Sequence, residues 1–226
     1  LSEIEKNLLN NKVLIVEGKA GIGKTQLFAN EAISLLKEND NALLITGSDC
    51  LSDINIFEQL KNNLRLSFDF ENLIDILEVI GETNRKIIPI FIDALNESWK
   101  PQLWKSVLPI LHKKISEKNY VRLAVSFRSE YQNSILPDGF LKLDDIVKIE
   151  HRGFRDNPFE AARQFLIYYG IQFTPLHMFN ANVYNPLFLT LYCKTYRGDE
   201  VELPVLYERL LEKTNSNLHL KLAKTI

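Results

Sequence analysis

Gly18-Lys-Ala-Gly-Ile-Gly23-Lys24-Thr25 is the stretch of sequence that decides the fold. It fits the pattern G-x-x-x-x-G-K-[ST] at every specified position, after the apolar run Lys12-Val-Leu-Ile-Val-Glu17 and before a segment with helical periodicity. Glycines let backbone N–H groups wrap a phosphate closely, and the N-terminus of the following helix adds a favourable dipole. A chance glycine-rich turn is the plain alternative, and the flanking strand and helix count against it. The stretch therefore predicts a P-loop.

Each position of this loop has an expected role. We expect it to hold an adenine nucleotide, ATP or ADP, together with Mg²⁺. Lys24 is expected to reach the β- and γ-phosphates, and Thr25 is expected to hold Mg²⁺ through its hydroxyl. The residues expected to contact the nucleotide are Gly18, Lys19, Ala20, Gly21, Ile22, Gly23, Lys24, Thr25 and Gln26.

Strand and helix patterns alternate through the first two thirds of the chain. Strands are predicted at 12–17, 42–46, 87–92, 121–127 and 145–150, and helices at 24–37, 54–64, 72–81 and 103–115. Pro89 counts against a regular central strand, because proline gives up a ladder hydrogen bond. The alternation predicts an α/β fold, a P-loop NTPase with a parallel five-stranded sheet of the ASCE type sandwiched by helices.

The alternation stops after residue 150. Helices are predicted at 159–169, 186–196 and 205–226, which indicates a small helical subdomain. We therefore expect a nucleotide-binding core at 1–150 and a helical subdomain at 151–226, whose last helix could begin a winged-helix region.

A second part of the site is expected where the strand Ile87-Ile-Pro-Ile-Phe-Ile92 ends in Asp93. A Walker B aspartate belongs at this place, facing Mg²⁺, so the metal site is expected at Thr25 and Asp93. Glu97 is the nearest further carboxylate and could polarise the attacking water. The alternative is that Asp93 caps the following turn and Glu97 is merely solvated. Motor-type ATPases usually carry a glutamate where Ala94 stands, so the displaced Glu97 suggests slow, switch-like hydrolysis.

Arg128 ends the strand Val125-Ser126-Phe127. In the usual strand order of such ATPases this strand lies between the P-loop strand and the Walker B strand, which brings its end close to the γ-phosphate. Arg128 is therefore expected to sense that phosphate through charge-assisted hydrogen bonds, and the expected catalytic set is Asp93, Glu97 and Arg128. The alternative is a surface pair with Glu130.

Composition restricts the partners. The 27 basic and 29 acidic residues leave a net charge of −2, which does not indicate a dominant nucleic-acid surface. Cys50 and Cys193 stand too far apart in sequence to suggest a disulfide framework or a paired metal motif, and no apolar run reaches membrane-span length, so we expect a cytoplasmic protein. The chain begins at Leu1 and its single methionine is Met178, so we expect a piece of a longer protein.

The combined motifs resemble the STAND class of signal-transducing ATPases, which includes NACHT domains. Ile90-Phe-Ile-Asp93-Ala-Leu-Asn-Glu97 is similar to the hydrophobic-Asp-Gly/Ala-Leu-Asp/Asn-Glu signature of that class, and Ser126-Phe127-Arg128 is similar to its sensor 1. His151-Arg-Gly153-Phe154, Tyr169-Gly170-Ile171 and Asn185-Pro186-Leu187-Phe188-Leu189 resemble the helical subdomain of antiviral STAND (Avs-type) ATPases. The resemblance implies that Pro186 packs near the adenine. Many NACHT relatives carry an acid in place of Asn96, so the role of catalytic base falls to Glu97 alone.

The resemblance implies a molecular switch in anti-phage defence. Such proteins hold ATP between the core and helical subdomains, sense a partner (a phage protein in Avs-type relatives) through a C-terminal region, and form homo-oligomers that activate an effector. Two alternatives stay beside this hypothesis. One is a DNA-directed AAA-like motor or loader, and the other is a nucleotide-binding scaffold that does not hydrolyse ATP.

Overall fold

The computed structural model describes residues 2–154, 157–172, 185–196, 208–209 and 211–212. Internal contacts divide the chain into two compact units. The first holds Leu1–Ala20 and Lys24–His151, and the second holds Gly21–Gly23 and the residues from Arg152 onward.

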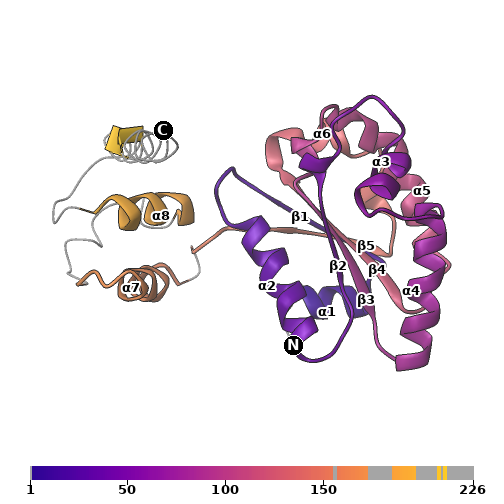
Figure 1. Ribbon diagram of the computed structural model, residues 1–226, viewed down its shortest axis with the longest axis horizontal. Coiled ribbons are helices and arrows are strands. Elements are labelled where there is room, and N and C mark those ends of the chain that lie inside the picture. The colour runs from indigo at the N-terminus through magenta and orange to yellow at the C-terminus, as the bar shows by residue number, and fades with distance from the viewer. Residues whose placement is uncertain (1, 155–156, 173–184, 197–207, 210, 213–226) are drawn as a thin grey trace, which may run out of the picture. The chain divides into compact units, whose positions relative to one another are not determined.

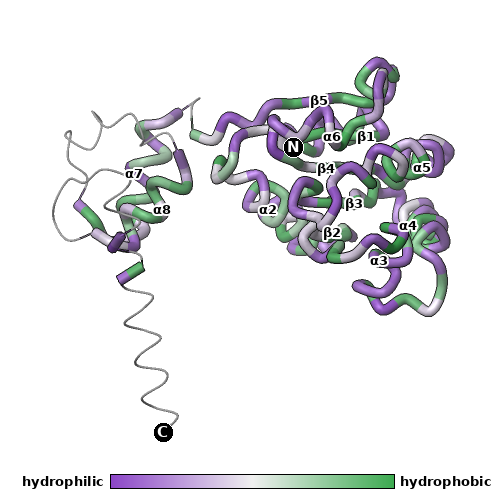
Figure 2. The backbone as a smooth tube through the Cα atoms, turned by 90° about the horizontal axis from the view of Figure 1, so that it is seen from above, coloured by the Kyte–Doolittle hydropathy of each residue, from purple (hydrophilic) through white to green (hydrophobic). Residues whose placement is uncertain are grey.

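The first unit is built on a sheet of five parallel strands in the order β2-β3-β4-β1-β5. Figure 1 labels the five strands, and Figure 2 shows their order, with β4 at the centre between β3 and β1. The strands are β1 (Val13–Gly18), β2 (Leu43–Thr46), β3 (Ile88–Asp93), β4 (Val121–Arg128) and β5 (Ile146–Glu150). The order places β4 between the P-loop strand and the strand that ends in Asp93, which confirms the predicted fold class.

Helices cover both faces of the sheet. The helices of this unit are α1 (Glu3–Asn10), α2 (Lys24–Lys37), α3 (Ile56–Asn63), α4 (Phe70–Asn84), α5 (Trp104–Ser116) and α6 (Gln132–Ile135), and the 3₁₀ turns are η1 (Gly47–Asp49), η2 (Leu95–Glu97), η3 (Pro101–Leu103), η4 (Ser129–Tyr131) and η5 (Phe140–Lys142). Helix α2 lies on one face, and α4 and α5 lie on the other (Figures 1 and 2). Along β1, Val13 and Ile15 join the core under α3, α4 and α5, whereas Leu14 and Val16 join the core under α1 and α2. This alternation follows from the period of two in a strand.

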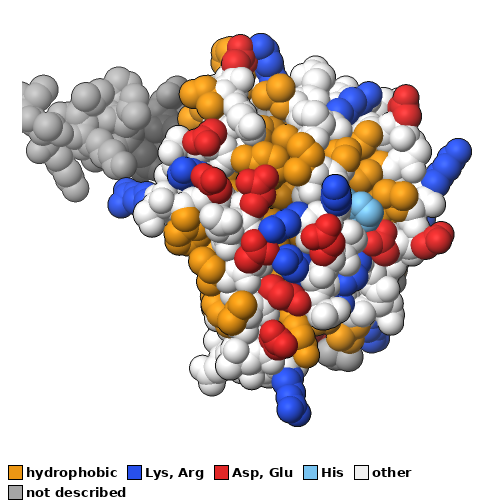
Figure 3. Space-filling model, turned by 90° about the vertical axis from the view of Figure 1, so that its right-hand side faces the viewer, with side chains coloured by type: hydrophobic (Ala, Val, Ile, Leu, Met, Phe, Trp, Pro, Cys, Tyr) orange, Lys and Arg blue, Asp and Glu red, His pale blue; other side chains and the backbone are white. Residues whose placement is uncertain are grey.

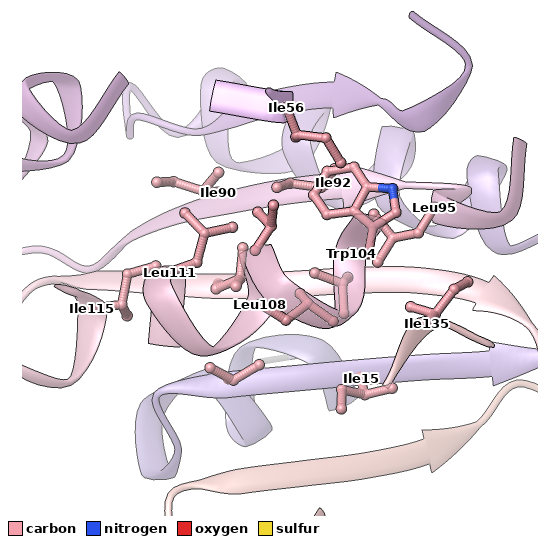
Figure 4. Close-up of a cluster of buried hydrophobic side chains, with 14 of the residues drawn as sticks. Ile15, Ile56, Ile90, Ile92, Leu95, Trp104, Leu108, Leu111, Ile115 and Ile135 are labelled. Carbon is pink, nitrogen blue, oxygen red and sulfur yellow. The ribbon is translucent and has the colours of Figure 1, made fainter. Parts of the chain in front are cut away.

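Trp104 is the largest side chain of the core under α5, and it is fully buried. It lies beside Ile92 and Leu95, at the end of β3 (Figure 4). Its indole Nε1 donates to Ser98 Oγ at 3.1 Å. Trp104 therefore anchors the segment that follows Asp93, whereas the other tryptophan, Trp99, is 65% exposed.

The strand predicted at 87–92 forms in spite of Pro89, and the register explains why. The amide of Ile88 donates to Tyr120 beside β4, so the nitrogen of Pro89 points to the opposite side, toward β2. Pairing with β2 begins only at Ile90, opposite Leu43. The proline therefore gives up no bond of the ladder.

The second unit contains α7 (Pro158–Tyr168) and α8 (Pro186–Thr195). Gly170 follows α7 in the left-handed region with φ +69°, and its amide donates to Ile167, as expected of a glycine that ends a helix. Asn185 caps α8, because its Oδ1 accepts from the amide of Leu187 at 2.9 Å. The predicted helix at 205–226 lies outside the described residues except for positions 208–209 and 211–212, which are helical. Among the described residues, no helix has the length and apolar character that crossing a membrane requires.

Candidate nucleotide-binding site

The P-loop runs from the end of β1 into α2, as its sequence predicts. Gly23 has a φ of +102°, in the region that favours glycine, and α2 begins at the next residue, Lys24. Lys24 is only 8% exposed, and its Nζ donates to the carbonyls of Gly18 at 2.7 Å and Lys19 at 2.9 Å. Burial lowers the pKa of the Lys24 ammonium, an effect that the carboxylate of Asp93 opposes. An anion beside this ammonium would offset the cost of burying its charge.

Asp93, at the end of β3, lies against the first turn of α2. Thr25 Oγ1 donates to Asp93 Oδ2 at 2.6 Å, and Ser126 Oγ donates to Asp93 Oδ1. Asp93 is 2% exposed, so its carboxylate is largely shielded from water. Each of its two oxygens accepts a hydrogen bond from a hydroxyl group. The structure thus brings together the two residues predicted to hold the metal.

The donor set fits magnesium. Thr25 and Asp93 supply hard oxygen atoms next to the phosphate loop, and Mg²⁺ in nucleotide sites is commonly held by one or two such oxygens, phosphates and water. Among the described residues there is no group of three or more His, Cys, Asp or Glu side chains that would form an all-protein metal cage. The arrangement is therefore suited to a metal that arrives with a nucleotide.

A strained turn carries the chain from Asp93 to Glu97. Ala94 has a φ of +54°, in the left-handed region, and its amide donates to Ser126 Oγ at 2.9 Å. The turn η2 then brings Leu95 back into the core, where it is fully buried. Gly47, which follows β2, packs against the backbone of this turn. A Cβ at this position would stand 2.4 Å from the Ala94 carbonyl oxygen, so only glycine fits there. These contacts fix the position of Glu97.

The end of β4 meets the same turn. The backbone amide of Arg128 donates to Asn96 Oδ1 at 3.0 Å, and Arg128 Nη2 donates to Glu97 Oε1 at 3.2 Å. Arg128 therefore pairs with Glu97 and not with Glu130, which was its expected alternative partner. Both side chains are substantially exposed, at 38% for Arg128 and 46% for Glu97, so water and ligands can reach the pair.

Three residues of the P-loop belong to the second unit. There the amide of Leu187 donates to the Gly21 carbonyl at 3.2 Å. Gly153, with φ +66°, lies so close to Ile22 and Pro186 that a Cβ would stand 2.9 Å from Ile22 Cδ1 and 3.2 Å from Pro186 Cδ.

The remaining expected contact residues lie in the first unit. Lys19, Ala20 and Gln26 are exposed, and the Gln26 side chain donates to Asn30 at 2.6 Å. All the nucleotide contacts expected of residues 18–26 and of Pro186 stay predictions.

Ser126 is the site residue that the sequence analysis missed. It is fully buried near the end of β4, and its hydroxyl contacts the end of the neighbouring strand β3. A polar residue two positions before a strand end, in an otherwise apolar run, was the signal available. Asn96 was noted only for lacking a charge, whereas the structure uses its amide oxygen to hold the end of β4.

No protein-family model matches this chain, and no curated protein matches it. Solved structures do. Domain III of the replication initiation protein DnaA from Thermotoga maritima is 18% identical, with a TM-score of 0.52 over 93% of this chain and 88% of that chain. AMPPCP-bound DnaA from Aquifex aeolicus is 16% identical, with a TM-score of 0.50 over 75% and 49% of the two chains. Drosophila ORC bound to DNA is 14% identical, with a TM-score of 0.51 over 82% and 51%. The fold is that of the P-loop ATPases.

These likenesses establish the fold and leave the finer assignment to proposals. This chain spans 49%, 63% and 61% of three solved replication-initiator chains. The resemblance to STAND ATPases gains no support from the comparisons.

Proposed function

We propose that this chain binds Mg²⁺-ATP and hydrolyses it slowly, as the switch domain of a larger ATPase. The observation that carries the proposal is the meeting of Thr25 Oγ1 and Asp93 Oδ2 at 2.6 Å, beside a buried Lys24 that donates to carbonyls of its own loop. A hydroxyl, a carboxylate and an ammonium at the start of a helix form the combination that binds a metal-bound polyphosphate.

The residues have separate tasks in this proposal. Lys24 exchanges the carbonyls of Gly18 and Lys19 for phosphate oxygens, and Thr25 and Asp93 hold the magnesium side of the nucleotide. The metal supplies charge neutralisation on the phosphate oxygens. Arg128 exchanges Glu97 for the terminal phosphate, and Glu97 then takes up a proton from the attacking water.

Slow turnover follows from the position of Glu97. It stands four residues after Asp93, at the end of a 3₁₀ turn, and it is paired with Arg128. Arg128 therefore competes with the attacking water for Glu97, which weakens the base until Arg128 takes another partner. A turnover of many ATP molecules per second would contradict this part of the proposal.

For the process that the switch controls, the comparisons favour a DNA-directed ATPase, because DnaA and ORC share the fold. The face formed by α4 and α5 carries interspersed basic and acidic side chains (Figure 3). On it Lys114 and Lys118 pair with Asp75 at 2.8 and 2.6 Å. These ion pairs reduce the positive charge that Lys114 and Lys118 offer to a phosphate backbone.

A second candidate is a STAND-type signalling ATPase in anti-phage defence. It is favoured by the segment Asp93-Ala-Leu-Asn-Glu97, in which Ala94 takes a left-handed conformation that places Glu97 against Arg128. In this candidate a sensed protein, such as a phage protein, shifts the chain toward a homo-oligomer that activates an effector.

The experiment is a steady-state ATPase assay of the purified chain with and without single-stranded and double-stranded DNA at low salt. ATP binding with slow turnover is expected in every case. Several-fold stimulation by DNA would support the DNA-directed candidate, and a rate unchanged by DNA would support the signalling candidate. Absence of any Mg²⁺-dependent affinity for adenine nucleotides would refute the proposed function itself.

A further inference from the structure

Ser126 contributes a buried hydroxyl group to the site, which packing of the strand alone would not require. It lies on β4, opposite Val16 of β1, and its side chain is fully buried. Its hydroxyl contacts two groups of the adjacent strand end, the carboxylate of Asp93 and the amide of Ala94.

The chemistry of these contacts fixes the direction of both hydrogen bonds. The amide of Ala94 can only donate, so Ser126 Oγ accepts from it, at 2.9 Å. The single hydroxyl proton of Ser126 then goes to Asp93 Oδ1. The other carboxylate oxygen, Oδ2, accepts from Thr25 at 2.6 Å. Each oxygen of Asp93 thus has one assigned partner.

We propose that Ser126 is a positioning residue for the metal site, which holds the Asp93 carboxylate so that Oδ2 faces Thr25 and Mg²⁺. A terminal carboxylate torsion is broad, and without a partner on Oδ1 it would sample other angles. The same hydroxyl restrains Ala94, the residue that begins the turn to Glu97. The inference rests on the proposed function, because it names how this chain orients a ligand of that nucleotide-bound metal.

The test compares the affinity of a fluorescent ATP analogue with and without Mg²⁺, in the parent and in Ser126→Ala. Groups that orient metal ligands typically change metal affinity by about 10- to 100-fold. We expect the metal-free affinity of Ser126→Ala to stay within about twofold, and the gain in affinity from Mg²⁺ to fall by about tenfold or more.

Ser98 offers a matched control in the same turn. It is also a buried serine, and its hydroxyl donates to the Leu95 carbonyl at 2.8 Å and accepts from Trp104, without touching Asp93. Ser98→Ala should lose stability and keep the full Mg²⁺ effect. Ser126→Thr, which retains the hydroxyl, should also keep it.

The outcomes separate this inference from the proposed function. If the parent gains affinity from Mg²⁺ and Ser126→Ala gains as much, or if Ser98→Ala loses the gain equally, Ser126 has no positioning role. If the parent itself shows no nucleotide affinity, the proposed function fails instead. If Ser126→Ala does not fold, the Ser126→Cys variant, with its weaker donor, should lose several-fold of the Mg²⁺ effect, and an undiminished effect would overturn the inference.

Discussion

Gly47→Ala tests whether the backbone contact behind Ala94 holds the turn that presents Glu97. A Cβ at Gly47 would stand 2.4 Å from the Ala94 oxygen, 2.9 Å from its carbonyl carbon and 3.0 Å from Leu95 Cα. All three are backbone atoms, so no side chain can rotate away. Overpacking of this kind typically costs about 1–3 kcal/mol of folding free energy. We expect Gly47→Ala to lose about 2 kcal/mol, and to hydrolyse ATP more slowly because Glu97 is displaced.

The assay is urea unfolding, combined with single-turnover hydrolysis of Mg²⁺-ATP. Gly139→Ala is the control, since a Cβ there meets nothing within 4 Å and the cost comes only from its φ of +77°. That control should lose about 1 kcal/mol and keep the parent's hydrolysis rate. A Gly47→Ala variant with parental stability and parental rate would refute the role of this contact.

Three further changes test other parts of the account. Glu97→Gln should abolish single-turnover hydrolysis and leave ATP affinity nearly intact, and full activity would mean that Glu97 is not the base. Arg128→Ala should change folding stability by less than about 1 kcal/mol, because the pair of Arg128 with Glu97 is exposed. The same variant should show a smaller preference for ATP over ADP in competition binding. An unchanged preference would contradict the sensing role of Arg128. Burial raises the pKa of Cys50 from about 9 to about 11, so the thiol's contribution to stability is complete below pH 9 and is lost as the pH rises to about 11. Between pH 8 and pH 11 the parent should therefore lose roughly 2 kcal/mol more stability than Cys50→Ala, and equal losses would contradict this.

Local sequence patterns were sufficient to predict the P-loop and the strands of the sheet. The glycines and Lys24 encode the loop by their spacing, and α2 begins and ends at the predicted residues, Lys24 and Lys37. The strand order was expected from the fold class, and with it the approach of Arg128 to the end of β3. Each of these features depends on residues that are neighbours in sequence, or on a topology that the motif itself implies.

Contacts between strand ends could not be derived in the same way. The bonds of Ser126 to Asp93 and of Asn96 to Arg128 join residues more than thirty positions apart, and they depend on the exact register of β3 and β4. Helix α1 was also missed, although Ser2 and Glu5 form a capping box at its start. With only eight residues, its formation depends on burying Ile4 and Leu8 against the sheet.

Isothermal titration of Mg²⁺-ATP into the parent and into Lys24→Ala tests the central claim most directly. Charge-assisted hydrogen bonds contribute about 1.5–3 kcal/mol each, so loss of the Lys24 ammonium should weaken binding by at least about tenfold. The variant should stay folded, because burial disfavours the charge of Lys24. Magnesium-dependent binding in the parent with this loss in the variant is the predicted result, and equal affinity of the two proteins would contradict the account.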